Sequence, residues 1–141
     1  MANTLQRRGS TILGGALSKQ SWVTAGDRVS KPWGHEVIFA LVPDLYCGKI
    51  LHINDGCALS LQFHETKDET IWVQSGTIHF EVGQSTDDLE SFDLLPGEGV
   101  RLAPKTIHRL TAKGDAVVLE ASTTQLDDVV RLLDMYGRIS D

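Results

Sequence analysis

The chain has 141 residues, of which 41% are hydrophobic and 23% are charged, and its formal net charge is −6. This length and composition predict one soluble domain that is large enough to bury a core without disulfides. The negative charge, without a dense basic stripe, argues against a nucleic-acid partner, and the lack of apolar runs of about 18 residues argues against a membrane span.

The first 30 residues differ in composition from the rest of the chain. They are rich in glycine, serine and threonine, and no acidic residue precedes Asp27. We expect residues 1–30 to form an extended arm that is ordered only where it docks, followed by a single domain over residues 31–141. The N-terminus lacks the apolar core of a signal peptide, so we expect a cytoplasmic protein. In that reducing compartment Cys47 and Cys57 should be free thiols, because they form no CxxC motif and no zinc-like pair.

From Glu36 onward, short β-prone runs alternate with turn signals such as Ser75-Gly76 and Pro96-Gly97. Turn signals every roughly 8–12 residues are typical of an all-β sandwich or barrel. The expected strands cover residues 36–42, 46–54, 58–64, 70–75, 77–82, 99–103, 107–113 and 116–122.

The pattern changes near the C-terminus. Four apolar residues recur there with helical spacing, namely Leu126, Val129, Val130 and Leu133. This spacing predicts a short helix over residues 125–136. Thr124 has the position of its N-terminal cap and Gly137 that of its stop signal.

Alternation along the strand expected at 58–64 predicts a polar pocket, because successive side chains point to opposite faces. One face would carry Ala58, Ser60, Gln62 and His64, and the other Leu59, Leu61 and Phe63. Glu69 begins the next expected strand. If the two strands pair as a hairpin, its carboxylate can lie beside the imidazole of His64.

The stretch GCALSLQFHETKDETIWVQSG, residues 56–76, resembles the first cupin motif. That motif places a His-x-His pair and a glutamate between two glycines, and here Gln62 stands in place of the first histidine. The stretch PGEGVRLAPKTIHRL, residues 96–110, resembles the second motif and supplies His108. Its usual Ile-Pro-x-Gly turn reads Leu102-Ala103-Pro104-Lys105, so the shape of that turn departs from the family pattern.

Four further stretches resemble the cupin domain of type II phosphomannose isomerases, a branch that also has glutamine at the first ligand position. These stretches are KPWGHE at 31–36, SLQFH at 60–64, IHRL at 107–110 and DDVVRLLDMYGR at 127–138. The resemblance implies a double-stranded β-helix, the cupin jelly roll. It also implies one divalent metal ion (Zn, Mn, Fe, Co or Ni). The implied ligands are Gln62, His64, Glu69 and His108, a mixed nitrogen and oxygen set that suits these ions.

The activity that this resemblance implies is a metal-dependent aldose–ketose isomerisation of a sugar phosphate, as in mannose-6-phosphate isomerase. Small cupins host many activities, so two alternatives stay open. One is a metal-dependent dioxygenase on the same scaffold, and the other is a non-catalytic cupin with a sugar-binding or regulatory role.

Two cationic residues are candidates for catalysis. Lys49 shares parity with Leu51 and Ile53 and should point into the barrel, where its amine needs a partner: either the substrate or a buried acid such as Glu120. Arg109 matches the His-Arg pair of the family. Its parity is opposite to that of His108, however, and places it outside the pocket unless a bulge intervenes.

Other residues have alternative roles that the sequence leaves open. We expect His35, His52 and His79 on the surface or in the core, outside the metal set. Trp33 either packs against the rim of the sheet or stacks on a sugar ring. Lys105 either reaches an anionic group at the barrel mouth or is solvated.

An apolar row predicts the assembly state. If the face of Gln62 lines the cavity, then Leu59, Leu61, Phe63 and Trp72 face outward. Four large apolar side chains on adjacent strands are unusual on the surface of a monomer. We therefore expect a homodimer in which the partner covers this row.

Overall fold

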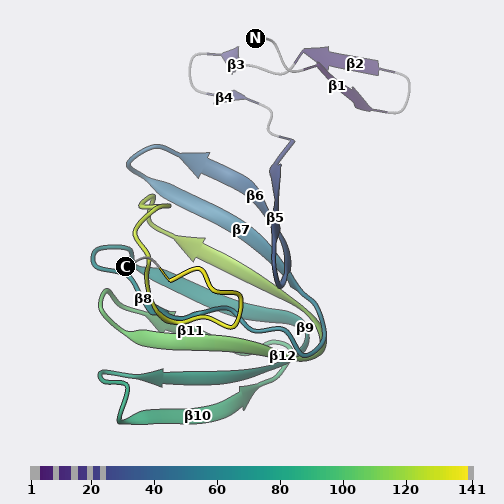
Figure 1. Ribbon diagram of the computed structural model, residues 1–141. Coiled ribbons are helices and arrows are strands. Elements are labelled where there is room, and N and C mark those ends of the chain that lie inside the picture. Colours follow the sequence, from purple (N-terminus) through teal and green to yellow (C-terminus); the bar gives the residue numbers. More distant parts are fainter. Residues whose placement is uncertain (1–3, 8–9, 14–15, 19–20, 23–24, 140–141) are drawn as a thin grey trace.

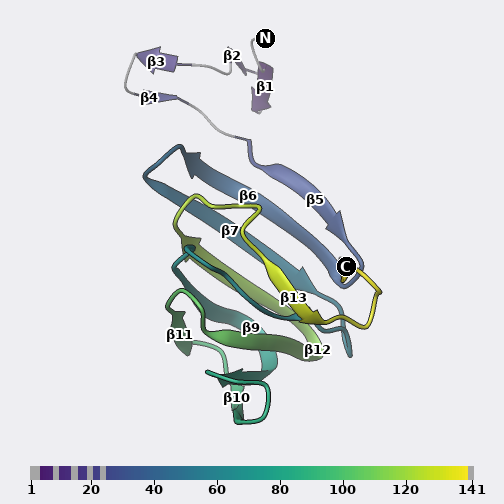
Figure 2. The same cartoon turned by 60° about the vertical axis from the view of Figure 1, so that its left-hand side comes forward.

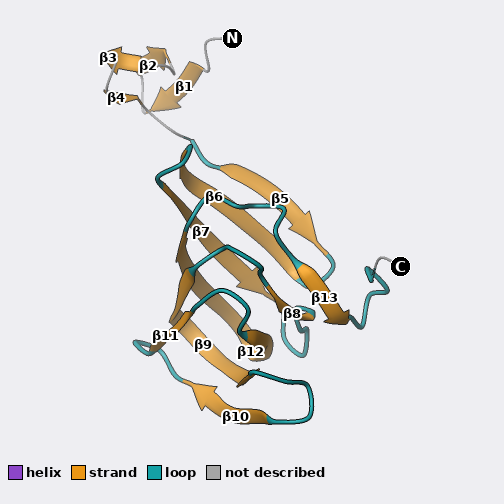
Figure 3. Ribbon diagram, turned by 90° about the vertical axis from the view of Figure 1, so that its left-hand side faces the viewer, coloured by secondary structure: helices purple, strands orange, loops and turns teal. Residues whose placement is uncertain are grey.

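The computed structural model describes residues 4–7, 10–13, 16–18, 21–22 and 25–139. All regular structure in these residues is β-strand, as Figure 3 shows. The predicted all-β class is therefore confirmed. None of the residues described forms a helix that could cross a bilayer.

The N-terminal region contains two short antiparallel pairs. β1 (Thr4–Arg7) pairs with β2 (Ser10–Leu13), and β3 (Ala16–Ser18) pairs with β4 (Ser21–Trp22). β5 (Asp27–Lys31) then joins the edge of the main sheet beside β6 (Gly34–Val42).

The main sheet is antiparallel and strongly curled, with the strand order β10-β9-β12-β7-β6-β5 (Figure 1). Its other strands are β7 (Tyr46–Ile53), β8 (Leu61–Phe63), β9 (Glu69–Gly83), β10 (Leu89–Leu94), β11 (Gly99–Leu102), β12 (Ile107–Ser122) and β13 (Val130–Leu133). β11 pairs with β9, while β8 pairs with both β12 and β13. In Figures 2 and 3 the segment that holds β13 passes in front of the curled sheet, so the C-terminal chain covers the concave side.

Two predicted turns are corners within long strands. The expected strands 70–75 and 77–82 both lie in β9, and 107–113 and 116–122 both lie in β12. The pairing of β9 with β12 shifts register at the corner. Gly76 allows the close approach, because a Cβ there would lie 2.5 Å from the backbone oxygen of Asp115.

The inward face of β9 joins the core to the polar pocket. Glu69, Ile71 and Val73 are buried, and Thr70 and Trp72 between them are exposed. The outward position of Trp72 agrees with the parity expected for it from the sequence. Burying each apolar side chain of the row contributes roughly 1.5–3 kcal/mol. Hydrophobic burial therefore fixes the direction in which Glu69 points.

The predicted helix over 125–136 is wrong. β13 occupies the middle of this range and pairs with β8, with Val130 opposite Phe63 and Arg131 opposite Gln62. Without β13, the free edge of β8 would leave its backbone groups unpaired. This requirement of the tertiary fold overrides the local helical spacing.

The predicted outward row is also wrong in part. Leu61 is only 2% exposed, and Leu59 lines the same cavity as Ser60 and Gln62. Strict alternation fails because β8 begins only at Leu61, so the residues before it do not follow a regular strand. Of the row, Trp72 is exposed, at 41%, and Phe63 is half-buried.

Candidate metal centre

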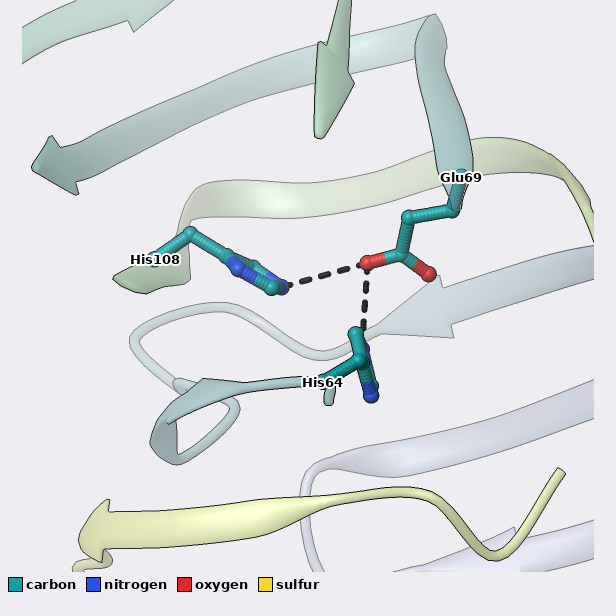
Figure 4. Close-up of side chains that lie close together, drawn as sticks. All are labelled: His64, Glu69 and His108. Atoms are coloured by element: carbon teal, nitrogen blue, oxygen red, sulfur yellow. Dashed lines mark ion pairs between the residues drawn. The ribbon is translucent and has the colours of Figure 1, made fainter. Parts of the chain in front are cut away.

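Three side chains, one from the loop after β8 and one each from β9 and β12, converge inside the barrel (Figure 4). The Nε2 atom of His64, just after β8, lies 3.3 Å from Oε1 of Glu69 at the start of β9. The Nε2 atom of His108 on β12 lies 3.2 Å from the same oxygen. All three side chains are buried, and their potential ligand atoms lie within 4.8 Å of one another. The structure thus brings together three of the four predicted metal ligands.

In both histidines, the contact that Nδ1 makes determines that the free lone pair lies on Nε2. Nδ1 of His64 contacts the backbone oxygen of Asp128, and Nδ1 of His108 lies 2.9 Å from the backbone oxygen of Thr106. A carbonyl oxygen can only accept a hydrogen bond, so each Nδ1 carries a proton. Each neutral imidazole therefore directs the lone pair of Nε2 toward Glu69.

This arrangement fits a divalent cation. The two Nε2 lone pairs and the carboxylate of Glu69 are three electron-pair donors in a buried space, and only a cation or a proton between them can offset their repulsion. Nε2 of His64 is buried and makes no hydrogen bond with the described part of the chain. Two imidazoles and a carboxylate form a nitrogen and oxygen set suited to transition metals.

Glu69 is ionised although it is buried. Burial alone would raise the pKa of Glu69, but the neighbouring imidazoles of His108 and His64, together with the charge of Lys67, hold it well below its ordinary range. The carboxylate is therefore ionised and available as a ligand near neutral pH. Protons on the imidazoles compete with a metal for the same position.

Gln62, the fourth predicted ligand, lies beside this cluster. It is directly opposite His108 in the pairing of β8 with β12, and it lines the cavity. Its Oε1 accepts a hydrogen bond of 2.6 Å from Oγ of Ser60. A carbonyl oxygen has a second lone pair, so this bond leaves Gln62 able to contribute to a metal site.

Lys67 is a site residue that sequence reasoning missed. Its Nζ lies 2.8 Å from Oε2 of Glu69 and 3.1 Å from Oε2 of Glu120. It therefore occupies one oxygen of Glu69 and leaves the other facing the histidines. Burial and the charge of Glu69 raise the pKa of Glu120, against the opposing effect of Lys67. The sequence signal for this ion pair was that Lys67 and Glu69 lie two residues apart.

Asp128 braces the loop between two of the ligands. Its carboxylate accepts hydrogen bonds from the backbone N–H groups of Glu65, Thr66 and Lys67 at 2.7–3.0 Å, and from Oγ1 of Thr66 at 2.9 Å. These bonds, the backbone bond from Thr66 first, hold the pKa of Asp128 below its ordinary range. The backbone oxygen of Asp128 also orients His64. Sequence reasoning missed this role because it placed Asp128 on a helix.

The two predicted catalytic cations lie in different places. Lys49 is buried and lines the cavity, as predicted, and its Nζ lies 3.4 Å from Oε1 of Glu36. Arg109 lies outside the cavity. Its guanidinium donates two hydrogen bonds, of 2.6 and 3.0 Å, to the carboxylate of Glu81 on the neighbouring strand β9.

The ligand cluster opens into a cavity of about 100 Å³. Trp33 is 3% exposed, packs in the hydrophobic core and forms part of the cavity wall. The remaining histidines lie elsewhere: His35 and His52 stack on each other at 4.3 Å, and His79 pairs with Asp93. Lys105 is exposed and does not line the cavity.

No family model and no curated protein sequence matches the chain. Several solved structures do resemble it. The capsular polysaccharide assembling protein CapF from Staphylococcus aureus is 17% identical with a TM-score of 0.68, over 81% of this chain and 35% of that one. KdgF from a Halomonas species is 23% identical with a TM-score of 0.61, over 72% of this chain and 89% of that one.

A cupin superfamily protein from Desulfitobacterium hafniense is 19% identical with a TM-score of 0.53, over 64% of this chain and 76% of that one. The chain thus spans about a third of CapF but most of the other two structures. At these identities the similarity establishes the shared fold.

Proposed function

We propose that this chain, which has the cupin fold, is a metal-dependent enzyme that interconverts the aldose and ketose forms of a sugar phosphate. The observation that carries the proposal is the buried Nε2 of His64, which has no hydrogen-bond partner among the described residues and faces Glu69 beside Nε2 of His108. This constellation supports one divalent ion (Zn, Mn, Fe, Co or Ni), with Gln62 as the fourth protein ligand. Such an ion, when bound, supplies a Lewis acid that polarises a carbonyl group.

The isomerisation also requires a base. It must take a proton from the carbon next to the carbonyl and return it to the former carbonyl carbon. Two cavity carboxylates lie outside the ligand set, Glu36 and Glu120. Glu36 contacts both Lys31 and Lys49. Burial raises the pKa of Glu120, which makes its carboxylate a stronger base than an exposed one, so we assign the proton transfer to Glu120.

Lys49 remains a candidate for substrate contact. Its amine lies at the cavity wall, and its ion pair with Glu36 holds it in place. A hydroxyl group of the substrate could accept a hydrogen bond from Lys49, because an ammonium group has three donors and Glu36 uses one.

A carbohydrate is the preferred substrate class for two reasons. The cavity wall combines hydrogen-bonding groups with the indole of Trp33, a combination suited to a polar molecule with apolar faces. One of the similar structures is a capsular polysaccharide assembling protein. Both points support the choice of a sugar for the first experiment.

The test is proton exchange at the carbon next to the carbonyl. The chain, loaded in turn with each of the five metals, is incubated with hexose phosphates in deuterated water and followed by NMR. We expect deuterium incorporation and ketose formation with the wild-type chain, and little of either with Glu120→Gln.

Two outcomes would contradict the isomerase. Iron-dependent oxygen consumption without exchange would favour a dioxygenase. Saturable sugar binding without exchange under any metal would favour a non-catalytic cupin.

A further inference from the structure

We propose that Arg131 anchors an oxyanion group, a carboxylate or a phosphate, of the molecule that enters the cavity. This inference rests on the function proposed above in one respect, namely that the metal cavity is where the substrate binds. The anion site itself can be tested without turnover and without a metal.

Arg131 lies in line with the candidate metal ligands. It is directly opposite Gln62 in the pairing of β13 with β8, and Gln62 is directly opposite His108 in the pairing of β8 with β12. All three side chains line the cavity. Neighbouring strands are about 4.8 Å apart, so the backbones of His108 and Arg131 are separated by roughly 10 Å across the wall. A small molecule can therefore span from the ligand cluster to the guanidinium.

The guanidinium of Arg131 has no carboxylate partner among the described residues. Its Nε is buried and makes no hydrogen bond with the residues that the structure describes. A buried donor without an acceptor costs roughly 1–3 kcal/mol, and more when it is charged. A group that arrives with the ligand and accepts this hydrogen bond would remove that cost.

The other cations of the cavity wall are already paired. Lys31 and Lys49 share Glu36. Lys67 lies between Glu69 and Glu120. Arg138 forms hydrogen bonds of 2.8 and 3.1 Å to the two carboxylate oxygens of Asp134. Within the part of the chain that the structure describes, Arg131 is thus the cavity cation that no acid neutralises.

The charge of the cavity selects an anion. Five cationic side chains but only three carboxylates line it. A divalent metal held by Glu69 would increase the positive excess. The planar guanidinium offers two parallel donors that match the oxygens of a carboxylate or phosphate. Arg131 and the candidate metal ligands line the same cavity of about 100 Å³, so a ligand that contacts both would carry its anionic group close to its metal-binding group.

The experiment titrates the metal-free, isotope-labelled chain with inorganic phosphate and, separately, with sodium acetate. NMR follows the Nε–H resonance of each arginine. We expect saturable shifts of the Arg131 resonance, and about tenfold or greater weakening of anion binding in Arg131→Met. Arg28→Gln is the matched control, because it removes the same charge from an exposed arginine on β5 that does not line the cavity. The anion that binds more tightly identifies the class, phosphate or carboxylate.

An Arg131 resonance that does not move with either anion would overturn the proposal, and this readout on the wild-type chain holds even if Arg131→Met fails to fold. Equal binding by a folded Arg131→Met and the wild type would also overturn it. The anion anchor and the isomerase can be disproved separately. Anion binding at Arg131 without exchange on any sugar phosphate would disprove the isomerase and leave the anchor. Exchange that Arg131→Met does not affect would disprove the anchor and leave the isomerase.

Discussion

At the scale of single residues, backbone carbonyl groups orient the two imidazoles of the candidate metal centre. The oxygens of Asp128 and Thr106 hold the Nδ1 atoms, so both Nε2 atoms face Glu69. Lys67 then occupies the remaining oxygen of that carboxylate. The cupin-like spacing allowed His64, Glu69 and His108 to be predicted. The carbonyl contacts could not be predicted, because any residue type can supply a backbone oxygen.

Asp128 gives the first prediction at this scale. Asp128→Asn should lower both the stability of the fold and the metal affinity, because an amide cannot replace all four hydrogen bonds that the carboxylate accepts from the loop after His64. Urea unfolding and metal titration measure the two effects. Asp127→Asn is the control, since the neighbouring Asp127 is exposed.

The effect of Asp128 should depend on pH in a definite direction. A carboxyl group whose folded-state pKa is lowered stabilises the fold above its unfolded pKa of about 4, and this contribution is lost as the pH falls through the folded value. The stability difference between wild type and Asp128→Asn should therefore be constant near neutral pH and shrink below about pH 4. A difference that grows on acidification would contradict the assignment.

At the scale of elements, the strand pairs around β8 show where the sequence pattern is insufficient. The first six residues of β9 alternate between buried and exposed, because a hydrophobic core stabilises that pattern directly. The segment after Thr124 has helical spacing but forms β13, since its backbone is needed along the edge of β8. β8 lies more than 60 residues earlier in the chain, so no local sequence pattern near residue 130 could reveal this pairing.

The corner shared by β9 and β12 gives a prediction for this scale. Gly76 and Gly114 have nearly the same backbone angle, φ of 77° and 76°, but only Gly76 faces the backbone of the opposite strand. Gly114→Ala should cost roughly 1–2 kcal/mol of stability, the penalty of a left-handed conformation. Gly76→Ala should cost clearly more, because its Cβ would also meet Asp115 and Ala116. If thermal unfolding shows the same loss of stability for both variants, the corner at Gly76 is less tightly packed than described.

At the scale of the whole molecule, the cupin fold was predictable from two motifs, and the similar structures confirm it. The reaction is less predictable than the fold, because cupins with the same barrel differ in what lines the cavity. Here the wall includes Lys67 and Arg131, which lie outside the residues predicted for the site. Their roles depend on which carboxylates each contacts, and only the folded chain brings these groups together.

The homodimer remains a prediction for this scale. The apolar row supports it less strongly, since Leu61 is buried and Leu59 lines the cavity, but Trp72 on β9 is 41% exposed. Analytical ultracentrifugation at micromolar concentration should give twice the chain mass of 15.5 kDa. A single species of 15.5 kDa would rule out the dimer. Trp72→Gln should then leave the sedimentation unchanged, whereas in a dimer it should promote dissociation.

We propose that His64, Glu69 and His108, with Gln62, hold one divalent metal. The measurement that tests it most directly is the metal content of the reconstituted chain by elemental mass spectrometry, for the wild type and for His108→Ala. We predict about one ion per wild-type chain and a metal content at least about tenfold lower in the variant. The circular dichroism spectrum should be unchanged. His79→Ala, which removes an imidazole outside the cavity, should load like the wild type. Equal metal content in a folded His108→Ala and the wild type would contradict the account.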